Sequence, residues 1–380
     1  MRNDIVKSGK KMYYFLEQII KIENKTKVKK EKTKQEIRMK ETNFKPVTAI
    51  TMGDPAGIGP ETIVMTMLAP EIHECCRPFV IGSIEILKKA AQVMKQELNY
   101  RKIENPEDAL FEMGTVDVLE TGSYDTDSIV WGEVQTLAGK MSIDWIMKSI
   151  ELGMSGRIDA VSTAPIHKGA IKLAGVKEPG HTEIYENYTH SPYALTMFSC
   201  HKLRVFFVSR HMSLVDACRY ATRERVLEFV VNIDKELRKI GIEKPRIAVA
   251  ALNPHGGDNG LFGTEELDEL IPAVEEAKKA GIDAVGPCPA DSVFHIGKSG
   301  CYDAILSLYH DQGHIACKTL DFEKSVTLTF GLPFIRSSVD HGTAFDIAGT
   351  GVANAVSLIE STKVVSEYAA LMKGKKKGEA

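Results

Sequence analysis

The sequence predicts a three-layer α/β protein built from parallel βαβ units. Short apolar runs alternate along the chain with longer segments whose apolar residues recur at helical spacing, which is the pattern of such units. Hydrophobic residues make up 43% of the chain, enough for a sizeable core. The length of 380 residues indicates two domains of ordinary size, or one large one.

The elements follow in order along the chain. Strands are predicted, as buried apolar runs, over 47–51, 78–82, 160–163, 205–208, 247–252, 304–308 and 331–336. Helices are predicted over 84–94, 223–240 and 265–280. Thr222 is a suitable N-cap for the second helix, and Gly281 ends the third.

Residues 1–44 differ from the rest because their second half is almost entirely charged or polar. We interpret them as a lysine-rich extension, disordered or forming a solvated helix, and a basic tail that contacts an acidic partner is the alternative. Met1 and Met39 are both possible starts of the protein.

Bulk properties limit the class of protein. The net charge of −3 gives no argument for nucleic acid or membrane binding, and no apolar run reaches the roughly 18 residues of a membrane span. Seven scattered cysteines without a CxxC pair indicate reduced thiols. We therefore expect a cytoplasmic protein.

Three histidines each closely follow a predicted buried strand. They are His211 after 205–208, His255 after 247–252 and His310 after 304–308. Rigid strand ends can present histidines to one cleft, so these three are candidate ligands of one divalent metal ion. The alternative is that each is a hydrogen-bonded structural histidine. His314 shares a face with His310 if that segment is helical.

A glycine-rich loop, MGDPAGIGPE at 52–61, follows the first strand and precedes a helix that begins near Pro60. Its glycines allow close backbone approach to a ligand, and a helix N-terminus favours anions. It does not match the dinucleotide-binding pattern GxGxxG, so the alternative is a tight strand-to-helix turn.

Further polar residues are candidates for anion binding or proton transfer. His181 and Thr182 suit the binding of a phosphate or carboxylate at a helix start. Arg336 places a cation at the end of an apolar run, which suits phosphate binding. Lys168 suits anion binding or proton transfer, and Asp291 suits a place near the metal. Taken singly, each has an ordinary surface or packing role as its alternative.

The last motif, residues 339–354, is polar and glycine-rich and opens an apolar helix. An acidic residue in such a loop can bond a ribose 2′-hydroxyl and repel a 2′-phosphate.

Nine ordered motifs give the chain a resemblance to the PdxA family of NAD-dependent 4-phosphate dehydrogenases, from about Val47 to Ser366. The motifs are MGDPAGIGPE at 52–61, HKG at 167–169, GHTE at 180–183, LNPHGGD at 252–258, GTEE at 263–266, PAD at 289–291, YHDQG at 309–313, GLPFIR at 331–336 and DHGTA at 340–344.

This resemblance implies a fold similar to isocitrate and isopropylmalate dehydrogenases, with two three-layer α/β/α domains flanking a cleft. One domain would comprise 45–160 and 306–373 on the cofactor side, and the other 161–305 with metal, substrate and dimer contacts. It also implies NAD as cofactor, with His341 and Asn354 at the adenine and Asp346 at the ribose.

The resemblance further implies a homodimer in which His211, His255 and His310 hold one divalent cation (Zn, Mg, Mn or Co) across the subunit interface. It assigns His181, Thr182, Lys318 and Arg336 to a small phosphorylated acid substrate, and Thr327 stands where the pyridoxine enzyme has asparagine. Lys168 and Asp291 are our catalytic candidates.

The residues around His211 and the extra His314 resemble a branch that oxidises 4-phospho-D-threonate or 4-phospho-D-erythronate at C3. Loss of carbon dioxide would then give dihydroxyacetone phosphate. The alternatives are 4-phosphohydroxy-L-threonine dehydrogenase of pyridoxal phosphate biosynthesis and a non-catalytic phosphometabolite-binding protein.

Overall fold

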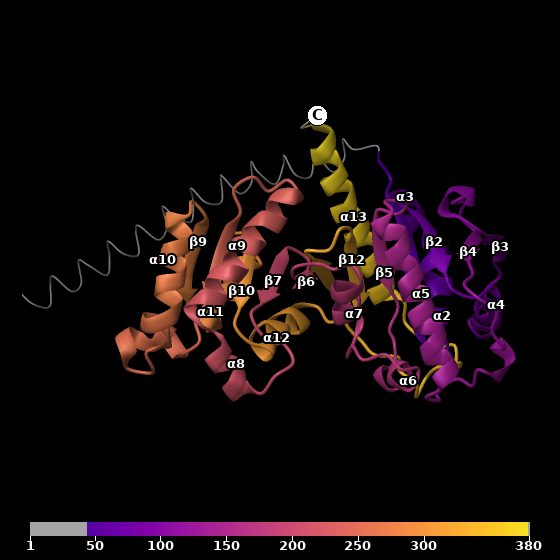
Figure 1. The fold of residues 1–380 in the computed structure, drawn as a ribbon, viewed down its shortest axis with the longest axis horizontal. Coiled ribbons are helices and arrows are strands. Elements are labelled where there is room, and N and C mark those ends of the chain that lie inside the picture. Colours follow the sequence, from indigo (N-terminus) through magenta and orange to yellow (C-terminus); the bar gives the residue numbers. More distant parts are fainter. Residues whose placement is uncertain (1–43, 379–380) are drawn as a thin grey trace, which may run out of the picture.

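The computed structural model describes residues 44–378, and these form one twelve-stranded sheet flanked by helices (Figure 1). The strands are ordered β3-β4-β2-β1-β5-β12-β11-β6-β7-β10-β8-β9. Their bounds are β1 (Val47–Thr51), β2 (Arg77–Ile81), β3 (Asn99–Ile103), β4 (Thr115–Leu119), β5 (Ala160–Thr163), β6 (Leu195–Cys200), β7 (Leu203–Phe207), β8 (Arg246–Ala250), β9 (Asp283–Cys288), β10 (Ala304–Ser307), β11 (Ser325–Phe330) and β12 (Ile335–Val339).

The helices connect these strands and pack on the sheet. They are α2 (Gly59–Leu68), α3 (Pro70–Cys75), α4 (Ile84–Val93), α5 (Thr136–Met154), α6 (Lys168–Leu173), α7 (His181–Tyr188), α8 (Leu214–Tyr220), α9 (Arg223–Lys239), α10 (Ile271–Lys279), α11 (Ala290–Gly297), α12 (His310–Leu320) and α13 (Val356–Gly378). Short helical turns are η1 (Pro106–Asp108), η2 (Thr126–Ser128), η3 (Pro254–Gly260) and η4 (Glu266–Leu270).

The sheet is parallel in its outer parts and antiparallel at its centre. β6 pairs antiparallel with both β7 and β11, and β11 pairs antiparallel with β12. The prediction of parallel βαβ units is therefore confirmed for the outer strands and incomplete at the centre, where β6 and β11 were not predicted.

The central strands are covered on both faces. Every residue of β5, β6 and β10 is buried, although successive side chains of a strand point to opposite faces. Burial on both faces requires a helical layer on each side of the sheet. The predicted three-layer α/β class is confirmed.

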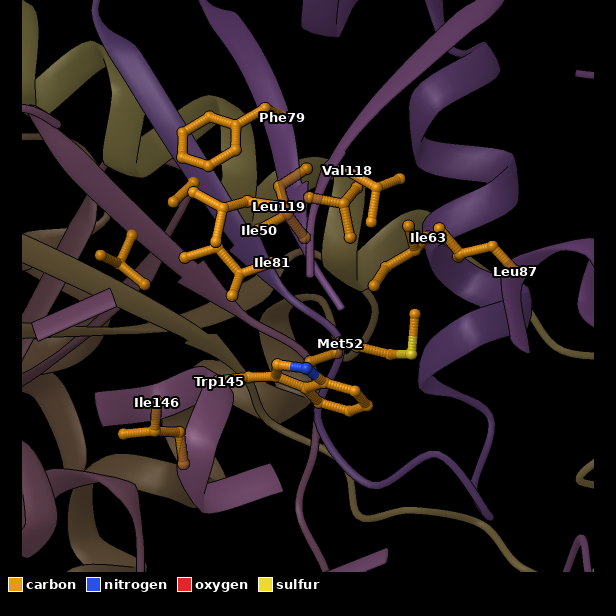
Figure 2. Close-up of a cluster of buried hydrophobic side chains, with 14 of the residues drawn as sticks. Ile50, Met52, Ile63, Phe79, Ile81, Leu87, Val118, Leu119, Trp145 and Ile146 are labelled. Atoms are coloured by element: carbon orange, nitrogen blue, oxygen red, sulfur yellow. The ribbon is translucent and has the colours of Figure 1, made fainter. Parts of the chain in front are cut away.

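One large core lies beside the strands from β2 to β5. Figure 2 shows Met52 after β1 close to Trp145 of α5, with Ile63 of α2 and Leu87 of α4 nearby, and all four are at most 1% exposed. Full burial of such side chains stabilises the fold by about 1.5–3 kcal/mol each. Met52 therefore anchors the glycine-rich loop that begins beside it.

The long helix α13 contacts the sheet through buried hydroxyl groups. Thr48 of β1 bonds Ser366 (2.8 Å between oxygens), and Ser337 of β12 bonds Ser361 (2.7 Å). Buried hydroxyls need partners, so these bonds fix how α13 lies across β1 and β12.

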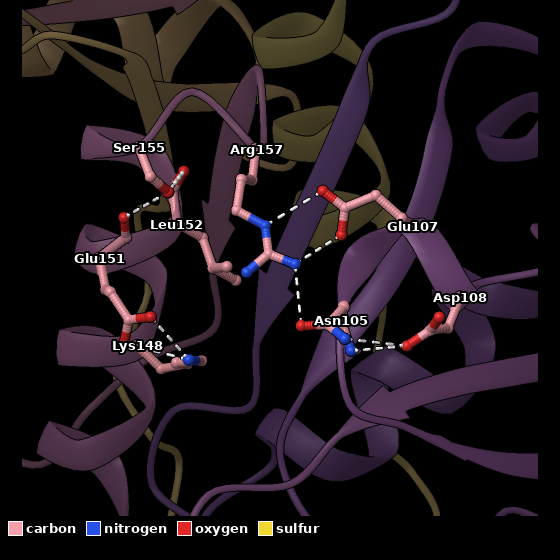
Figure 3. Close-up of polar contacts among 8 residues, drawn as sticks. All are labelled: Asn105, Glu107, Asp108, Lys148, Glu151, Leu152, Ser155 and Arg157. Atoms are coloured by element: carbon pink, nitrogen blue, oxygen red, sulfur yellow. Dashed lines mark hydrogen bonds and ion pairs between the residues drawn. The ribbon is translucent and has the colours of Figure 1, made fainter.

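At the outer edge of the β3–β4 region, Arg157 makes a bidentate contact with Glu107 (Figure 3). Arg157 also donates to Asn105, which itself bonds Asp108. The pair is exposed, so it contributes at most about 1 kcal/mol. It links the turn before β5 to the loop after β3.

One predicted strand has different bounds, and this changes the place of Arg336. Residues 331–334 form a turn, and β12 begins at Ile335, so Arg336 stands near the start of a strand and does not end one. Gly331 has a φ of +91°, and a side chain there would meet the Tyr193 carbonyl oxygen. The apolar run Leu332–Phe334 is a packed turn.

The predicted boundary near 305 falls inside β10, which pairs with β7 and β8. The division into two domains stays a prediction. The lysine-rich extension, apart from residue 44, and the choice of start lie outside the described residues. Within 44–378, no helix has the length and apolar character needed to cross a membrane.

Candidate active site

The strands that precede the three predicted metal ligands are neighbours in the sheet. β10 pairs parallel with β7 on one side and with β8 on the other. Carboxyl ends of parallel strands meet at one edge of a sheet, so His211, His310 and His255 all emerge at the same edge. The rings of His211 and His310 lie 6.2 Å apart between centroids.

His255 is not brought into the same group. It lies in η3, a run of left-handed residues in which its own φ is 55°, and its ring faces Phe262 with centroids 6.4 Å apart. Among residues 44–378, no group of three or more histidines, cysteines or carboxylates is placed to hold a metal ion.

The His310 imidazole is held from two sides. Its Nδ1 lies 2.5 Å from an Asp311 carboxylate oxygen, and its ring stacks on His314 with centroids 3.8 Å apart and planes inclined by 14°. His314 in turn packs against Phe198 and Phe207. The helical α12 confirms that His310 and His314 share a face, and burial lowers the pKa of His314 to about 3.

The surroundings of His211 disfavour its protonation. Burial, with the nearby charges of Arg210 and Lys168, lowers the pKa of its imidazole, which favours the neutral form. Lys168 begins α6 and is exposed, so this predicted catalytic residue lies on the His211 side of the site.

Arg336 is a buried cation among hydroxyl groups. It is 1% exposed and donates to Thr163 Oγ1 (2.8 Å) and Thr329 Oγ1 (3.2 Å). Within the described residues it has no ion pair, and its Nε has no hydrogen-bond partner. Burial lowers its pKa to about 10, although the charge of Glu183 opposes the shift, so it stays charged near neutral pH. No carboxylate of the described residues forms an ion pair with it, which leaves a buried charge without direct neutralisation.

His181 lies beside this buried cation. It is the first residue of α7, and Gly180 precedes it as N-cap. Its Nε2 is buried without a partner, and burial followed by the charge of Arg336 holds its pKa well below its usual range. A neutral imidazole, a helix start and an unpaired guanidinium together match the needs of a phosphate. Thr182 is the next residue of the helix.

Tyr185 also belongs to this buried cluster, although sequence reasoning missed it. Its ring lies 5.3 Å from the Arg336 guanidinium carbon, and its hydroxyl bonds Ser149 (2.5 Å). Its position one helical turn after His181 was the only available signal.

The other predicted substrate residues, Lys318 and Thr327, have partners outside this cluster. Lys318 of α12 forms an ion pair with Asp340 (2.7 Å), which follows β12. Burial raises the pKa of Asp340 even though Lys318 opposes the shift. Thr327 is half-buried in β11, opposite Phe198 of β6.

The predicted cofactor loop is bound to the first glycine-rich loop. Buried Glu61 accepts hydrogen bonds from the backbone of Gly349 (3.0 Å) and Gly351 (2.9 Å). Ile58 also donates its N–H to the Thr343 carbonyl (3.0 Å). The two loops that flank the carboxyl ends of β1 and β12 therefore act as one unit.

Within that unit, the predicted cofactor residues keep accessible side chains. Asp346 and Asn354 are exposed and His341 is half-buried. Asn354 donates to Glu323 (3.0 Å), and His341 Nδ1 lies 2.9 Å from the Gly342 carbonyl. An exposed carboxylate in a glycine-rich loop fits a ribose hydroxyl.

Two residues of the loops were not predicted as functional. Asp54 is fully buried, accepts from Ala56 N (2.9 Å) and leaves Oδ2 without a partner, and burial raises its pKa to about 6. His167 caps α6 by accepting from Gly169 N and stacks on Phe345 (4.7 Å). Both stand in motifs already noted, GDP and HKG.

Asp291 stands apart from this cluster. It is exposed in the first turn of α11, and no hydrogen bond or ion pair joins it to another predicted site residue within 44–378. Helix α11 packs beside η3, so Asp291 lies on the His255 side.

Comparison with known proteins supplies independent findings. Residues 74–365 match the family model described as pyridoxal phosphate biosynthetic protein PdxA. A protein of Halalkalibacterium halodurans provisionally named D-threonate 4-phosphate dehydrogenase is 49% identical over 86% of this chain and 98% of its own. A protein of the same provisional name from Symbiobacterium thermophilum is 49% identical, covering 86% and 97%.

Among solved structures, a 4-hydroxythreonine-4-phosphate dehydrogenase from Burkholderia phymatum is 41% identical. It superposes with a TM-score of 0.78 and covers 86% of this chain and 99% of that one. The resemblance drawn from the motifs is confirmed.

Proposed function

The chain belongs to the PdxA family, and from this we propose that it oxidises the C3 hydroxyl of a four-carbon 4-phosphorylated acid, 4-phospho-D-threonate or 4-phospho-D-erythronate. The names of its relatives support an oxidoreductase that acts on a phosphorylated acid. We further propose NAD as the oxidant, loss of carbon dioxide as the second step, and the cytoplasm as its location. Seven free thiols are in keeping with that compartment.

One observation carries this proposal. Arg336 is buried, charged and without an ion pair in the described chain, and His181, whose Nε2 has no partner, lies beside it. A buried cation without a counter-ion is costly unless a ligand supplies one. The phosphate of the substrate is that counter-ion, and Thr182 and Lys318 complete its contacts in the proposal.

The hydroxy-acid branch is favoured over the amino-acid branch. The relatives named for D-threonate 4-phosphate are 45% to 49% identical, against 41% for the solved hydroxythreonine-phosphate enzyme. Thr327 replaces the asparagine that the resemblance associates with an amino-acid substrate.

We propose that His211 and His310 hold a divalent cation (Zn, Mg, Mn or Co) together with His255 of a second copy. The neutral imidazole of His211 and the fixed ring of His310 fit such a ligand role.

Exposed apolar side chains next to two of these histidines support a homodimer. Leu214 and Val215 near His211 are each 60% exposed, and Leu261 near His255 is 70% exposed. Contiguous exposed apolar residues mark interaction surfaces. Asp291, on the helix that packs beside η3, would enter the site with His255.

The proposed chemistry assigns a task to each group. A divalent cation bound there supplies Lewis-acid stabilisation of negative charge on the C3 oxygen. Arg336 and His181 would fix the phosphate and so orient C3. NAD, held by His341, Asp346 and Asn354, would accept the hydride from C3, while the hydroxyl proton leaves to water. The resulting β-keto acid breaks its C1–C2 bond and releases carbon dioxide.

Lys168 then donates a proton to C2, which gives dihydroxyacetone phosphate. Its place beside His211 supports this role, and its exposure allows it to regain a proton from water.

His341, Asp346 and Asn354 would bind the adenosine part of NAD. Replacing Asp346 with Asn should narrow the preference for NAD over NADP, and equal rates of the unmodified enzyme with both nucleotides would refute that assignment.

The test of the proposal is NADH formation with three acids. The expected order of kcat/KM places 4-phospho-D-threonate or 4-phospho-D-erythronate above 4-phosphohydroxy-L-threonine. The reverse order would assign the protein to pyridoxal phosphate biosynthesis, and binding without turnover would indicate a non-catalytic binding protein.

A further inference from the structure

Arg210 and Arg336 are anchored at neighbouring positions across the sheet. Arg336 donates to Thr329 Oγ1 of β11, and Arg210 donates to Thr196 Oγ1 of β6. These two threonines are directly paired in the antiparallel register. Directly paired residues share a face of the sheet with Cβ atoms about 4.5–5.5 Å apart, so the two guanidinium groups are held side by side.

Arg210 differs from Arg336 because it has a carboxylate partner. Its Nη2 lies 3.5 Å from Glu183 Oε1, and Glu183 stands in the first turn of α7, two residues after His181. Both side chains are partly accessible, at 24% and 32%. The pair is therefore linked to Arg336 through the paired threonines and to His211 as the next residue in the chain.

We propose that the Arg210–Glu183 pair makes this site select a 2-hydroxy acid over the matching 2-amino acid, with Arg210 as the specificity-determining residue. This inference rests on the proposed function, in which the phosphate lies at Arg336 and C3 lies at His211. C2 then lies beside C3, within reach of a side chain that flanks His211.

The physical reason is charge. At neutral pH a 2-amino acid carries an ammonium group at C2, where the hydroxy acid carries a neutral hydroxyl. A fixed guanidinium repels the ammonium and can donate a hydrogen bond to the hydroxyl. Glu183 alone would attract an ammonium, but Arg210 offsets its charge.

This arrangement predicts that a variant without the Arg210 charge loses selectivity and also uses the amino acid better. Removing the charge of Arg210 removes the repulsion and also frees the Glu183 carboxylate as a partner for an ammonium. Selectivity should therefore relax through improved use of the amino acid, and that gain should depend on Glu183.

The experiment compares the full-length enzyme with Arg210→Gln, Arg210→Lys and the double variant Arg210→Gln/Glu183→Gln. For each, kcat/KM and equilibrium binding are measured with 4-phospho-D-threonate and 4-phosphohydroxy-L-threonine, which differ in the C2 substituent. Arg210→Lys retains the charge and is the matched control. Equilibrium binding still measures the selectivity of a variant that has lost its turnover.

Arg210→Gln should lower the preference for the hydroxy acid by at least about tenfold, whereas Arg210→Lys should keep most of it. The double variant should not show the improved kcat/KM and binding for the amino acid. An unchanged preference in Arg210→Gln, or a gain that persists in the double variant, would overturn the inference. Failure of the unmodified enzyme to bind or oxidise 4-phospho-D-threonate, 4-phosphohydroxy-L-threonine and also 4-phospho-D-erythronate would overturn the proposed function itself.

Discussion

The ring of His314 stacks on the ring of His310 with centroids 3.8 Å apart, one helical turn along α12. Phe198 and Phe207 support the far side of His314, so the stack is held rigidly from the sheet. His310 can thus keep one orientation at the edge of the sheet, as a metal ligand must.

Replacing His314 with Ala should weaken divalent-metal affinity by about 10–100-fold, because His310 loses the surface that orients it. His314→Phe keeps a ring of similar size and should retain most of the affinity. Titration with metal ions, read by bound metal after dialysis, separates this effect from turnover. Equal affinity in the unmodified and His314→Ala proteins would contradict it.

Arg336→Met should lower kcat/KM by at least about a hundredfold, because the phosphate loses a charge-assisted partner. The melting temperature should change by only about 3 °C, since relief of the buried charge offsets the lost bonds to Thr163 and Thr329. Arg157→Met, at the exposed pair with Glu107, is the matched control and should keep kcat/KM. Full activity in Arg336→Met would exclude Arg336 from the substrate site.

The buried carboxyl group of Asp54 makes the free energy of unfolding depend on pH. Its folded pKa of about 6 lies above the ordinary 3.8 because burial disfavours the carboxylate. The folded state therefore holds this proton more tightly than the unfolded state does. The contribution of Asp54 to the free energy of unfolding is complete below about pH 4. It is lost, by up to about 3 kcal/mol, as the pH rises through about 6.

Asp54→Asn should remove this component, because an amide stays neutral and can still accept from Ala56 N. Urea unfolding at pH 4.5 and pH 7.5 checks the difference. The variant should gain stability relative to the unmodified protein as the pH rises. A difference in free energy of unfolding that is the same at both pH values would rule out a titrating Asp54.

A metal site shared by two copies predicts complementation. His211→Ala and His255→Ala should each be inactive, but a mixed dimer contains one site with both defects and one intact site. Mixing the variants and allowing subunits to exchange should restore about a quarter of the activity. Mass spectrometry of labelled subunits confirms the exchange. Mixed dimers without activity would place the three histidines in one chain.

The arrangement of the three candidate histidines could be predicted because they follow apolar runs. His211, His255 and His310 come shortly after buried strands, and parallel strands present their carboxyl ends at one edge. The helix that begins at His181 was also predictable from the glycine before it.

Other features depended on contacts between distant segments. Nothing near Asp54 indicates full burial, because the backbone of Pro165, which accepts from its N–H, is far away in sequence. Arg336 was assigned to the end of a strand because the apolar turn before it has the composition of a strand. The Arg210–Glu183 pair arises only when β7 and α7 are brought together.

The measurement that tests the central claim most directly is the product balance of one turnover reaction. The enzyme would be supplied with 4-phospho-D-threonate, NAD and a divalent metal ion, and NADH, carbon dioxide and dihydroxyacetone phosphate would be quantified together. The account predicts equal amounts of all three. NADH without carbon dioxide would contradict the decarboxylation, and the absence of all three products, with 4-phospho-D-erythronate also inert, would contradict the proposed function.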